Sequence, residues 1–247
     1  MATVIQMILL FIIGATGGWI VEFFYRRIKH GNWVNPGFLV GPTLPLYGFG
    51  LVGMYLIASI DFGTGSELLQ KIISIVILCF VVNIMEFISG LIFTECFKVR
   101  LWDYSDMKGN VRGIVCPLFS FIWSVIVAVY CLFLHDVLAG VISGVSDNAV
   151  LVFFMGIYIG VFIIDNVYSF NVVAHIRKWA KDNELVVKYE RLKDTVKEKA
   201  QFFKDKIRFL LPFKTRDGLN SELEYYKGKY LDEKEESENS DAEINNI

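Results

Sequence analysis

The chain has 247 residues, of which 54% are apolar and only 20% are charged, and its mean hydropathy is +0.48. Residues 1–170 contain 8 Lys/Arg and 10 Asp/Glu, whereas residues 171–247 contain 16 of each kind. A soluble domain needs a polar surface over its core, so the composition excludes a soluble globular enzyme and a disordered protein for residues 1–170. It predicts an integral membrane protein with a charged tail.

Apolar runs divide residues 1–170 into segments that approach the roughly 20 residues needed to cross a bilayer. The predicted fold is all-α: a polytopic membrane domain with five transmembrane helices, followed by a cytoplasmic amphipathic helix. No basic residue precedes the first run, so we expect it to be a helix of the mature protein and not a signal peptide. The five predicted spans are Val4–Tyr25, Leu44–Ile60, Ile72–Phe97, Ile114–His135 and Asn148–Phe170.

Basic residues alternate between the connections and thereby predict the orientation. Two connections are basic, and we call them the first basic connection (Arg26–Pro42) and the second basic connection (Lys98–Pro117). The connection between the second and third spans has only Lys71, at its end, and the last connection has no Lys or Arg. We therefore expect a multi-pass protein of the cell membrane with its N-terminus outside and its C-terminus in the cytoplasm.

The tail divides into a basic part and an acidic part. Residues 171–213 hold 11 Lys/Arg against 6 Asp/Glu, and their apolar residues follow the spacing of an amphipathic helix. That helix either lies on the inner membrane surface or serves as a coiled coil or docking helix for a cytoplasmic partner. Residues 214–247 hold 5 Lys/Arg against 10 Asp/Glu and are predicted to be a disordered acidic tail. The helix positions are Leu185, Tyr189, Leu192, Val196, Ala200, Phe203, Ile207 and Leu210.

The sequence lacks the motifs of several kinds of chemistry. No GxxxxGK[ST] run is present, so the chain is not expected to bind ATP in the P-loop manner. The three histidines and four cysteines form no metal-ligand spacing, and the basic residues form no nucleic-acid stripe. We therefore expect no enzyme activity, no metal, no cofactor and no nucleic-acid partner. An intramembrane enzyme acting on lipid is less favoured because no nucleophile–base or metal set appears.

Polar side chains inside the spans are the candidates for a site, because ionisable groups there are costly and usually face the bundle interior. Glu86 and Asp165 each lie 12 residues before a basic residue, about 18 Å along a helix, which places them near the midplane. They either bind a substrate or coupling cation, or have a structural role in which each acid pairs with an inward Arg or is protonated and hydrogen-bonds a neighbouring helix. For Glu22 the structural interpretation is favoured, since Arg26 follows four residues later. The candidates are Glu86, Asp165, Asn83, Asn166 and Glu22.

The two basic connections are unusually apolar and aromatic. In the first, Asn35-Pro36-Gly37 predicts a turn, yet its neighbours are too apolar for a solvated loop. This composition favours a re-entrant segment, which requires protein to cover its backbone. In the second, Asp103 can pair with a nearby Arg. The motif candidates in these connections are Arg26, Arg27, Trp33, Asn35, Trp102, Asp103 and Arg112.

A short internal match suggests a parallel helix-pair repeat. Ile20–Phe23 resembles Ile84–Phe87, and each copy leads into a basic connection that contains Trp. Transporters often place their sites at the interface between such repeats.

The connections also resemble a known family. The run GWIVEFFYRR…HGNWVNPGFLVGPTLPLYGFG from Gly18, MEF at Met85 and LWDYSDMKGNVRG at Leu101 are similar to the CmpB-like family of type IV ABC-transporter membrane proteins. The resemblance covers roughly residues 15–125, continues more loosely through the fifth span, and does not include the tail. The EAA-type sequence of familiar ABC-permease coupling loops is absent here.

Two classes of function follow from these features. The resemblance implies a permease component of a transport system in the lipid bilayer, with a separate ATP-binding subunit because the chain has no ATPase motif. The alternative is a membrane-embedded binding or regulatory scaffold that recruits a cytoplasmic partner through its C-terminal helix. Five spans are few for a complete pathway, so we expect a homo-oligomer.

Overall fold

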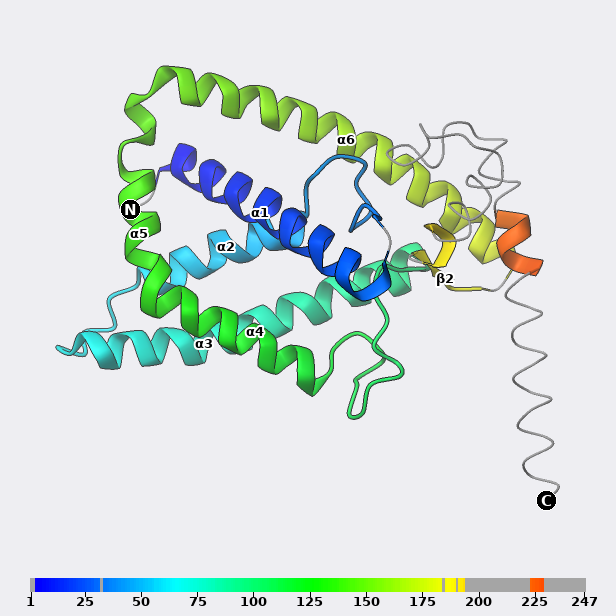
Figure 1. Ribbon diagram of the computed structural model, residues 1–247, viewed down its shortest axis with the longest axis horizontal. Coiled ribbons are helices and arrows are strands. Elements are labelled where there is room, and N and C mark those ends of the chain that lie inside the picture. The colour runs from blue at the N-terminus through cyan, green and yellow to red at the C-terminus, as the bar shows by residue number, and fades with distance from the viewer. Residues whose placement is uncertain (1–2, 32, 184, 190, 194–222, 229–247) are drawn as a thin grey trace.

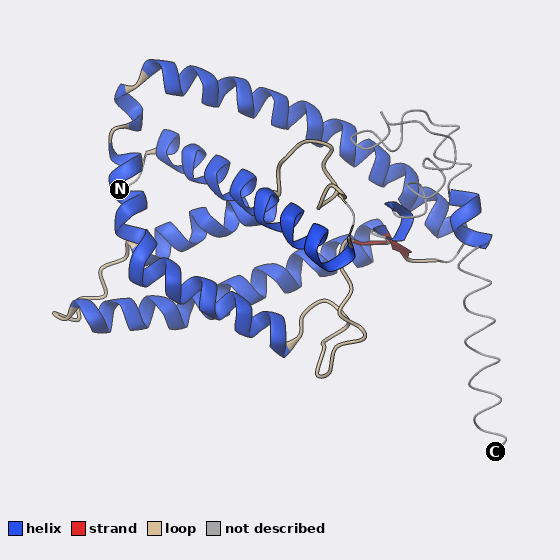
Figure 2. Ribbon diagram, in the orientation of Figure 1, coloured by secondary structure: helices blue, strands red, loops and turns tan. Residues whose placement is uncertain are grey.

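The computed structural model describes residues 3–31, 33–183, 185–189, 191–193 and 223–228, and it is mostly helical (Figures 1 and 2). Two short strands pair near the end of the longest helix. The elements are α1 (Val4–His30), α2 (Pro45–Ala58), α3 (Glu67–Leu91), η1 (Ile92–Cys96), β1 (Val99–Arg100), α4 (Pro117–Val129), η2 (Tyr130–Leu134), α5 (His135–Ser143), η3 (Val145–Asp147), α6 (Ala149–Asp182) and β2 (Val187–Lys188).

Local sequence signals explain where the helices begin and end. Thr3 and Gln6 form a capping box at the start of α1, which ends at Gly31 in the left-handed conformation. The side chain of Ser66 caps α3, and that of Asn148 caps α6. α2 and α4 both begin with proline, which needs no hydrogen-bond acceptor for its nitrogen at a helix start.

Four helical segments are long and apolar enough to cross a membrane: Val4–Ile28, Glu67–Cys96, Pro117–Ser143 and Ala149–Asp182. The third of them combines α4, η2 and α5. The second predicted span, Leu44–Ile60, is not shown as a span. Its helix, α2, has only 14 residues and is about 21 Å long, less than the roughly 30 Å of a bilayer core.

α2 is short because it begins beside the middle of α1. Residues 33–44 fold back along α1, and the amide of Leu44 donates a hydrogen bond to the carbonyl of Ala15 at 3.0 Å. Figure 1 shows this loop leaving the end of α1 and returning to the interior between α1 and α6 before α2 starts. The first basic connection therefore folds back against α1, and its entry into the membrane stays a prediction.

Close backbone contact joins α1 and α2. A Cβ atom on Gly14 would lie 2.7 Å from the carbonyl oxygen of Tyr47, and one on Gly48 would lie 2.9 Å from that of Phe11. Glycine at both positions lets the two helices approach more closely than any side chain would allow.

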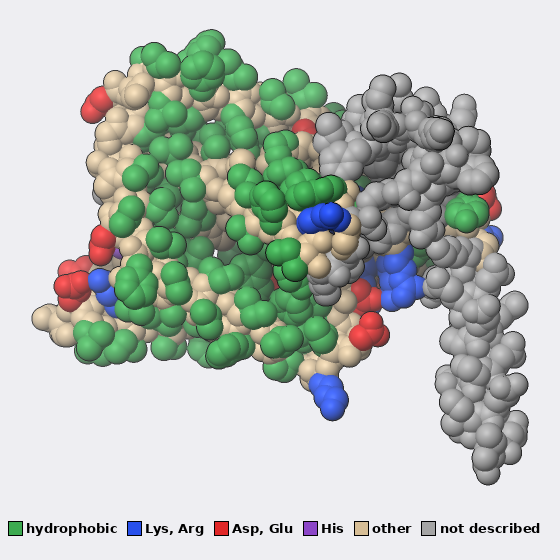
Figure 3. All heavy atoms as spheres, in the orientation of Figure 1, with side chains coloured by type: hydrophobic (Ala, Val, Ile, Leu, Met, Phe, Trp, Pro, Cys, Tyr) green, Lys and Arg blue, Asp and Glu red, His purple; other side chains and the backbone are tan. Residues whose placement is uncertain are grey.

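The outer surface of the helices is apolar. Figure 3 shows hydrophobic side chains over the middle of the helices, and charged side chains mainly at the two ends. Phe80, Phe121, Phe133 and Phe153 are among the large apolar residues exposed on this surface. Since large exposed apolar surfaces are rare on soluble proteins, this band fits a lipid bilayer.

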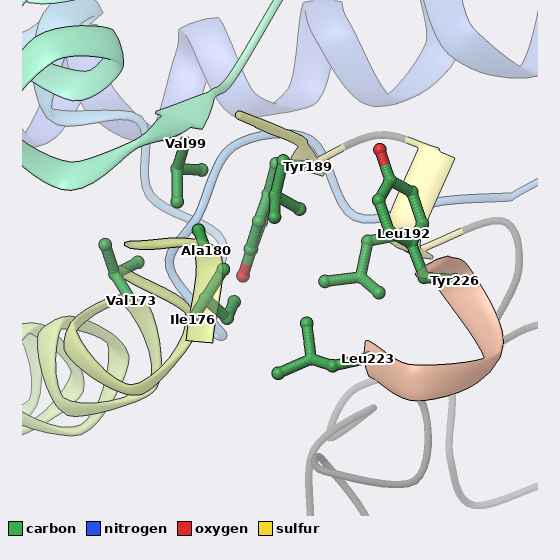
Figure 4. Packing of buried hydrophobic residues seen from close by; sticks show 9 residues of the cluster. Val99, Val173, Ile176, Ala180, Tyr189, Leu192, Leu223 and Tyr226 are labelled. Carbon is green, nitrogen blue, oxygen red and sulfur yellow. The ribbon is translucent and has the colours of Figure 1, made fainter. Parts of the chain in front are cut away.

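The end of α6, both strands and residues 223–228 form a small apolar core at the tail end of the bundle. β1 and β2 pair in parallel, with Val99 beside Val187. Figure 4 shows side chains from β1, α6 and the helical residues 223–228 pointing toward one another. The buried members are Val99, Val173, Ile176, Ala180, Val187, Tyr189, Leu192, Leu223 and Tyr226.

Because of this core, the tail differs from the predicted continuous helix and disordered end. The helix predicted through residues 171–213 is interrupted: residues 171–182 continue α6, and Val187–Lys188 form β2. Tyr189 and Leu192 are buried as apolar helix positions would be, but against the protein itself. Within the tail predicted to be disordered, residues 223–228 are helical and pack on this core. Val196, Ala200, Phe203, Ile207, Leu210 and the acidic end from Asp232 lie outside the described residues.

We predict that Gly14→Ala lowers the thermal midpoint of the detergent-solubilised protein. The new methyl group would meet the backbone of α2, and such overpacking costs about 1–3 kcal/mol, more than the gain of about 1 kcal/mol in helix propensity. Gly17→Ala is the matched control, since its Cβ would meet no atom within 4 Å. An equal or higher midpoint for Gly14→Ala than for Gly17→Ala would contradict the packing described here.

Candidate functional site

The strongest candidate site is a group of polar side chains inside the bundle, which we call the interior polar cluster. It draws on α1, α2, α3, α4 and the second basic connection. Two carboxylates, one guanidinium and two phenols form most of it. Its members are Glu22, Arg26, Tyr47, Glu86, Tyr104 and Trp123.

Glu22 occupies the α1 side of the interior polar cluster. Its Oε1 lies 3.3 Å from Nε of Arg26, and its Oε2 accepts a hydrogen bond from the hydroxyl of Tyr47 at 3.3 Å. The ring of Tyr47 fits against Gly18, where an added Cβ would lie 2.4 Å from it. The predicted Glu22–Arg26 pair is present, and Glu22 therefore has a positive counter-ion.

Glu86 occupies the α3 side and is 4% exposed. Its Oε1 accepts a long hydrogen bond of 3.4 Å from the hydroxyl of Tyr104. The indole of Trp123 lies near this carboxyl group, but among the described residues neither Glu86 Oε2 nor Trp123 Nε1 has a partner with good hydrogen-bond geometry. Glu86 is thus a buried acid that accepts fewer hydrogen bonds than an ionised carboxylate can accept.

Tyr104 enters this cluster from the second basic connection. Its ring stacks on Phe119 with centroids 4.4 Å apart, and its amide donates to the carbonyl of Gly113 at 2.8 Å. Burial is the largest cause that raises the pKa of the Tyr104 phenol. The phenol therefore keeps its proton at neutral pH and acts as a hydrogen-bond donor.

Asp165 has different neighbours from the two glutamates. It lies near the middle of α6, where its oxygens accept hydrogen bonds from the amides of Val40 at 3.0 Å and Gly41 at 2.9 Å. Ser169, one turn later, donates a third at 3.0 Å. A Cβ on Gly41 would lie 2.9 Å from Asp165 Oδ2, so glycine permits this approach. Asp165 therefore satisfies backbone groups of the folded-back loop, as a re-entrant segment requires.

The two candidate asparagines bond to their own helices. Asn83 donates to the carbonyl of Cys79, and Asn166 to that of Phe162, both at 2.7 Å. The structure gives neither amide a contact with a carboxylate of another helix in the described part of the chain.

Aromatic and amide contacts hold the first basic connection. Asn35 is buried; it accepts from Trp19 Nε1 at 2.6 Å and donates to the carbonyls of Leu39 and Val40. Trp33 stacks on Phe23 at 4.7 Å, and the guanidinium of Arg27 lies 5.4 Å from the Trp33 ring. Two of the predicted motif residues, Asn35 and Trp33, therefore fix the loop against α1.

Asp103 organises the second basic connection. Its Oδ1 accepts from Arg100 at 3.0 Å and from Ser105, while its Oδ2 lies 2.6 Å from Nζ of Lys188 on β2. Burial alone would raise the pKa of Asp103, but the bonds from Lys188 and Ser105 outweigh it and lower the pKa to about 2. Asp103 thus links this connection to the tail.

Trp102 and Arg112, the remaining motif residues, lie at the edges of the same connection. Trp102 donates from Nε1 to the carbonyl of Ile114 at 2.9 Å and packs beside Gly90 of α3. Arg112 is largely exposed and lies 3.5 Å from Glu95. Trp102 therefore has a packing role, whereas Arg112 is available at the surface.

The tail also holds the first basic connection. Lys193 Nζ donates to the carbonyl oxygens of Asn35, at 2.8 Å, and Gly37. The hydroxyl of Tyr189 donates to the carbonyl of Phe38 at 3.4 Å. Residues 187–193 therefore bind both basic connections, one through Asp103 and the other through backbone carbonyls.

Of the residues predicted from sequence, the structure brings Glu22, Arg26 and Glu86 into one cluster and places Asp165 at the folded-back loop. Sequence reasoning missed Tyr47 and Tyr104, although a phenol in an apolar segment usually needs a polar partner. It also missed Tyr158, whose hydroxyl lies 2.8 Å from that of Thr16 and 3.0 Å from that of Thr43.

The structure is a helical bundle with an apolar exterior, a folded-back loop and buried acids. These are the features of a polytopic membrane protein. Residues 9–170 match the family described as "Putative ABC-transporter type IV", and the chain belongs to this family. No curated protein and no solved structure matches the chain. The match includes the interior polar cluster and both basic connections.

We predict that Asp165→Asn increases hydrogen–deuterium exchange at residues 38–44. The substitution removes the negative charge that the amides of Val40 and Gly41 donate to, and hydrogen bonds to charged groups contribute about 1.5–3 kcal/mol. Mass spectrometry of the detergent-solubilised protein measures the exchange. Asn166→Ala is the neighbouring control and should leave these peptides unchanged; equal exchange in wild type and Asp165→Asn would refute the role of the carboxylate.

The Asp103–Lys188 contact predicts a pH dependence. Because the folded protein lowers the pKa of Asp103 from 3.8 to about 2, the contact stabilises the fold above about pH 4 and loses that effect as pH falls toward 2. Asp103→Asn should therefore lower the thermal midpoint at neutral pH, and the difference from wild type should shrink between pH 4 and pH 2. Asp106→Asn, on the exposed side of the same loop, should show no such trend.

Proposed function

We propose that the chain is the membrane component of a transport system, in which the interior polar cluster lies on the path of the transported species. The observation that carries this proposal is the burial of Glu86, at 4% exposure, in a cluster that also contains Glu22. Buried ionisable groups in membrane helices usually mark pathways or ion sites. The family to which the chain belongs is consistent with that role.

The proposed topology has five crossings, with the N-terminus outside and the C-terminus in the cytoplasm. Residues 33–44 run from the end of α1 to its middle, and α2 continues from there, so the loop and α2 together make one crossing. Figure 1 supports an odd number, since α1, α3 and α6 run in the same direction. The basic residues near the ends of α1, α3 and α6 then lie on the cytoplasmic side.

ATP hydrolysis in such a system belongs to a separate subunit, because the sequence has no P-loop. We propose that this subunit docks on the cytoplasmic face formed by the two basic connections and residues 187–193. Contacts between these segments favour this arrangement over a scaffold with a free recruiting helix, since Lys193, Tyr189 and Lys188 bind the protein's own connections. We also propose that copies of the chain associate with one another through their apolar exterior.

Affinity purification of the full chain in mild detergent tests the proposed partner. We expect an ATP-binding subunit to copurify at a fixed ratio, and we expect Glu86→Gln to copurify equally well because the Glu86 side chain is buried and glutamine keeps its size. Copurification of a different soluble protein that is lost on truncation at residue 171 would instead support the scaffold.

Transport itself is tested with inside-out vesicles energised by ATP, followed by comparison of the solutes inside and outside. We predict that Glu86→Gln abolishes the ATP-dependent change in solute content, whereas Glu95→Gln, an exposed acid on the same helical segment, retains it. Identical solute profiles for wild type and Glu86→Gln would contradict a role for this cluster in transport.

A further inference from the structure

We propose that Glu86 is a proton-binding site: its carboxyl group carries a proton in the folded state and exchanges it with water when the interior polar cluster becomes accessible. This inference rests on the proposed function, because it assigns a proton to a side chain of the cluster proposed to lie on the transport path.

The charges of the cluster do not balance when both acids are ionised. Arg26 lies 3.3 Å from Glu22 and neutralises it, but the described contacts of Glu86 include no cation. The other groups facing this site are two phenols, a thiol and an indole, and none of them is a cation: Tyr47 of α2, Tyr104 and Cys116 of the second basic connection, and Trp123 of α4. One additional proton on Glu86 makes the cluster neutral, which the low-polarity interior of a membrane protein favours.

The hydrogen bonds identify Glu86 as the group that holds the proton. Its Oε1 accepts one long bond from Tyr104, and its Oε2 has no partner in the part of the chain that the structure describes. A protonated carboxyl needs fewer donors than a carboxylate, which can accept about four bonds. The phenol of Tyr104 does not compete for this role, because its raised pKa keeps it protonated.

A metal cation fits the site less well than a proton does. Metal ions such as Ca²⁺ and Mg²⁺ bind six or more oxygen atoms. The described residues contain no group of three or more His, Cys, Asp or Glu side chains that could hold an ion. The free oxygen of Glu86 and two phenols supply too few ligands, whereas a proton needs only one.

Infrared spectroscopy of the purified full chain in detergent tests the site without any substrate or ATPase. We expect the absorption of a protonated carboxylic acid at neutral pH in wild type, its loss in Glu86→Gln, and its persistence in Glu95→Gln and Asp165→Asn. Tyr104→Phe, which keeps the carboxyl group, should shift its titration to higher pH because the carboxylate loses a donor. An unchanged acid band in Glu86→Gln, or a Tyr104→Phe titration identical to wild type, would overturn the inference.

Thermal midpoints measured across a pH series give a second test. If the folded chain binds one more proton than the unfolded chain, each unit of rising pH increases the unfolding equilibrium constant about tenfold. Wild type should therefore lose stability between pH 6 and pH 9 more steeply than Glu86→Gln does. A midpoint that rises with Na⁺ or K⁺ at constant pH, only when Glu86 is present, would instead identify a metal-cation site.

These measurements separate the two proposals. Titration of Glu86 without ATP-dependent solute movement would leave the proton site standing and remove the transport function. Solute movement that needs Glu86, with no protonated acid lost in Glu86→Gln, would keep the path and reject the proton.

Discussion

The hydrogen bonds from the amides of Val40 and Gly41 to Asp165 are the interaction on which the rest of the bundle depends. A backbone that leaves its helix inside a membrane exposes N–H and C=O groups that lipid cannot satisfy. The carboxylate of Asp165 satisfies two of these amides, and Ala15 accepts a third, from Leu44. α2 can then start at the middle of α1, and this position brings the hydroxyl of Tyr47 to Glu22. One acid on α6 thus sets the geometry of a cluster built by other helices.

Much of this architecture could be predicted from the sequence, and the reasons for the failures are physical. The long helices follow from apolar length, and their ends from caps such as Thr3, Ser66 and Asn148. The length of α2 could not be predicted, because hydropathy does not distinguish a helix that crosses a bilayer from an apolar loop followed by a short helix. Glu22 and Glu86 could be nominated as costly buried acids, but their proximity depends on how Tyr47 and Tyr104 are placed by tertiary contacts.

The tail shows a different limit of sequence reasoning. A helical spacing of apolar residues predicted that Tyr189 and Leu192 would lie on the apolar face of an amphipathic helix, and both are buried in a core of the chain itself. The partner surface was unpredictable, because it combines Val99 of β1 with the end of α6, segments that are far apart in sequence. The strands that pair Val99 with Val187 have two residues each, which is too few to produce a periodic pattern in the sequence. Lys188 and Lys193 belong to the basic segment 171–213, and each has an oxygen acceptor on a connection of the same chain.

Both basic connections consequently depend on α6 and the residues that follow it. Asp165 holds the inner part of the first connection, while Lys193 and Tyr189 hold its outer part. Lys188 holds Asp103 of the second connection, which also carries Tyr104 to Glu86. A displacement of α6 along its axis would therefore act on the two connections together, and through Tyr47 and Tyr104 on both glutamates. Most of the apolar exterior of α6 is not buried inside the protein, so the bonds of Asp165 and the apolar core at the end of α6 are links through which such a displacement would reach the interior polar cluster.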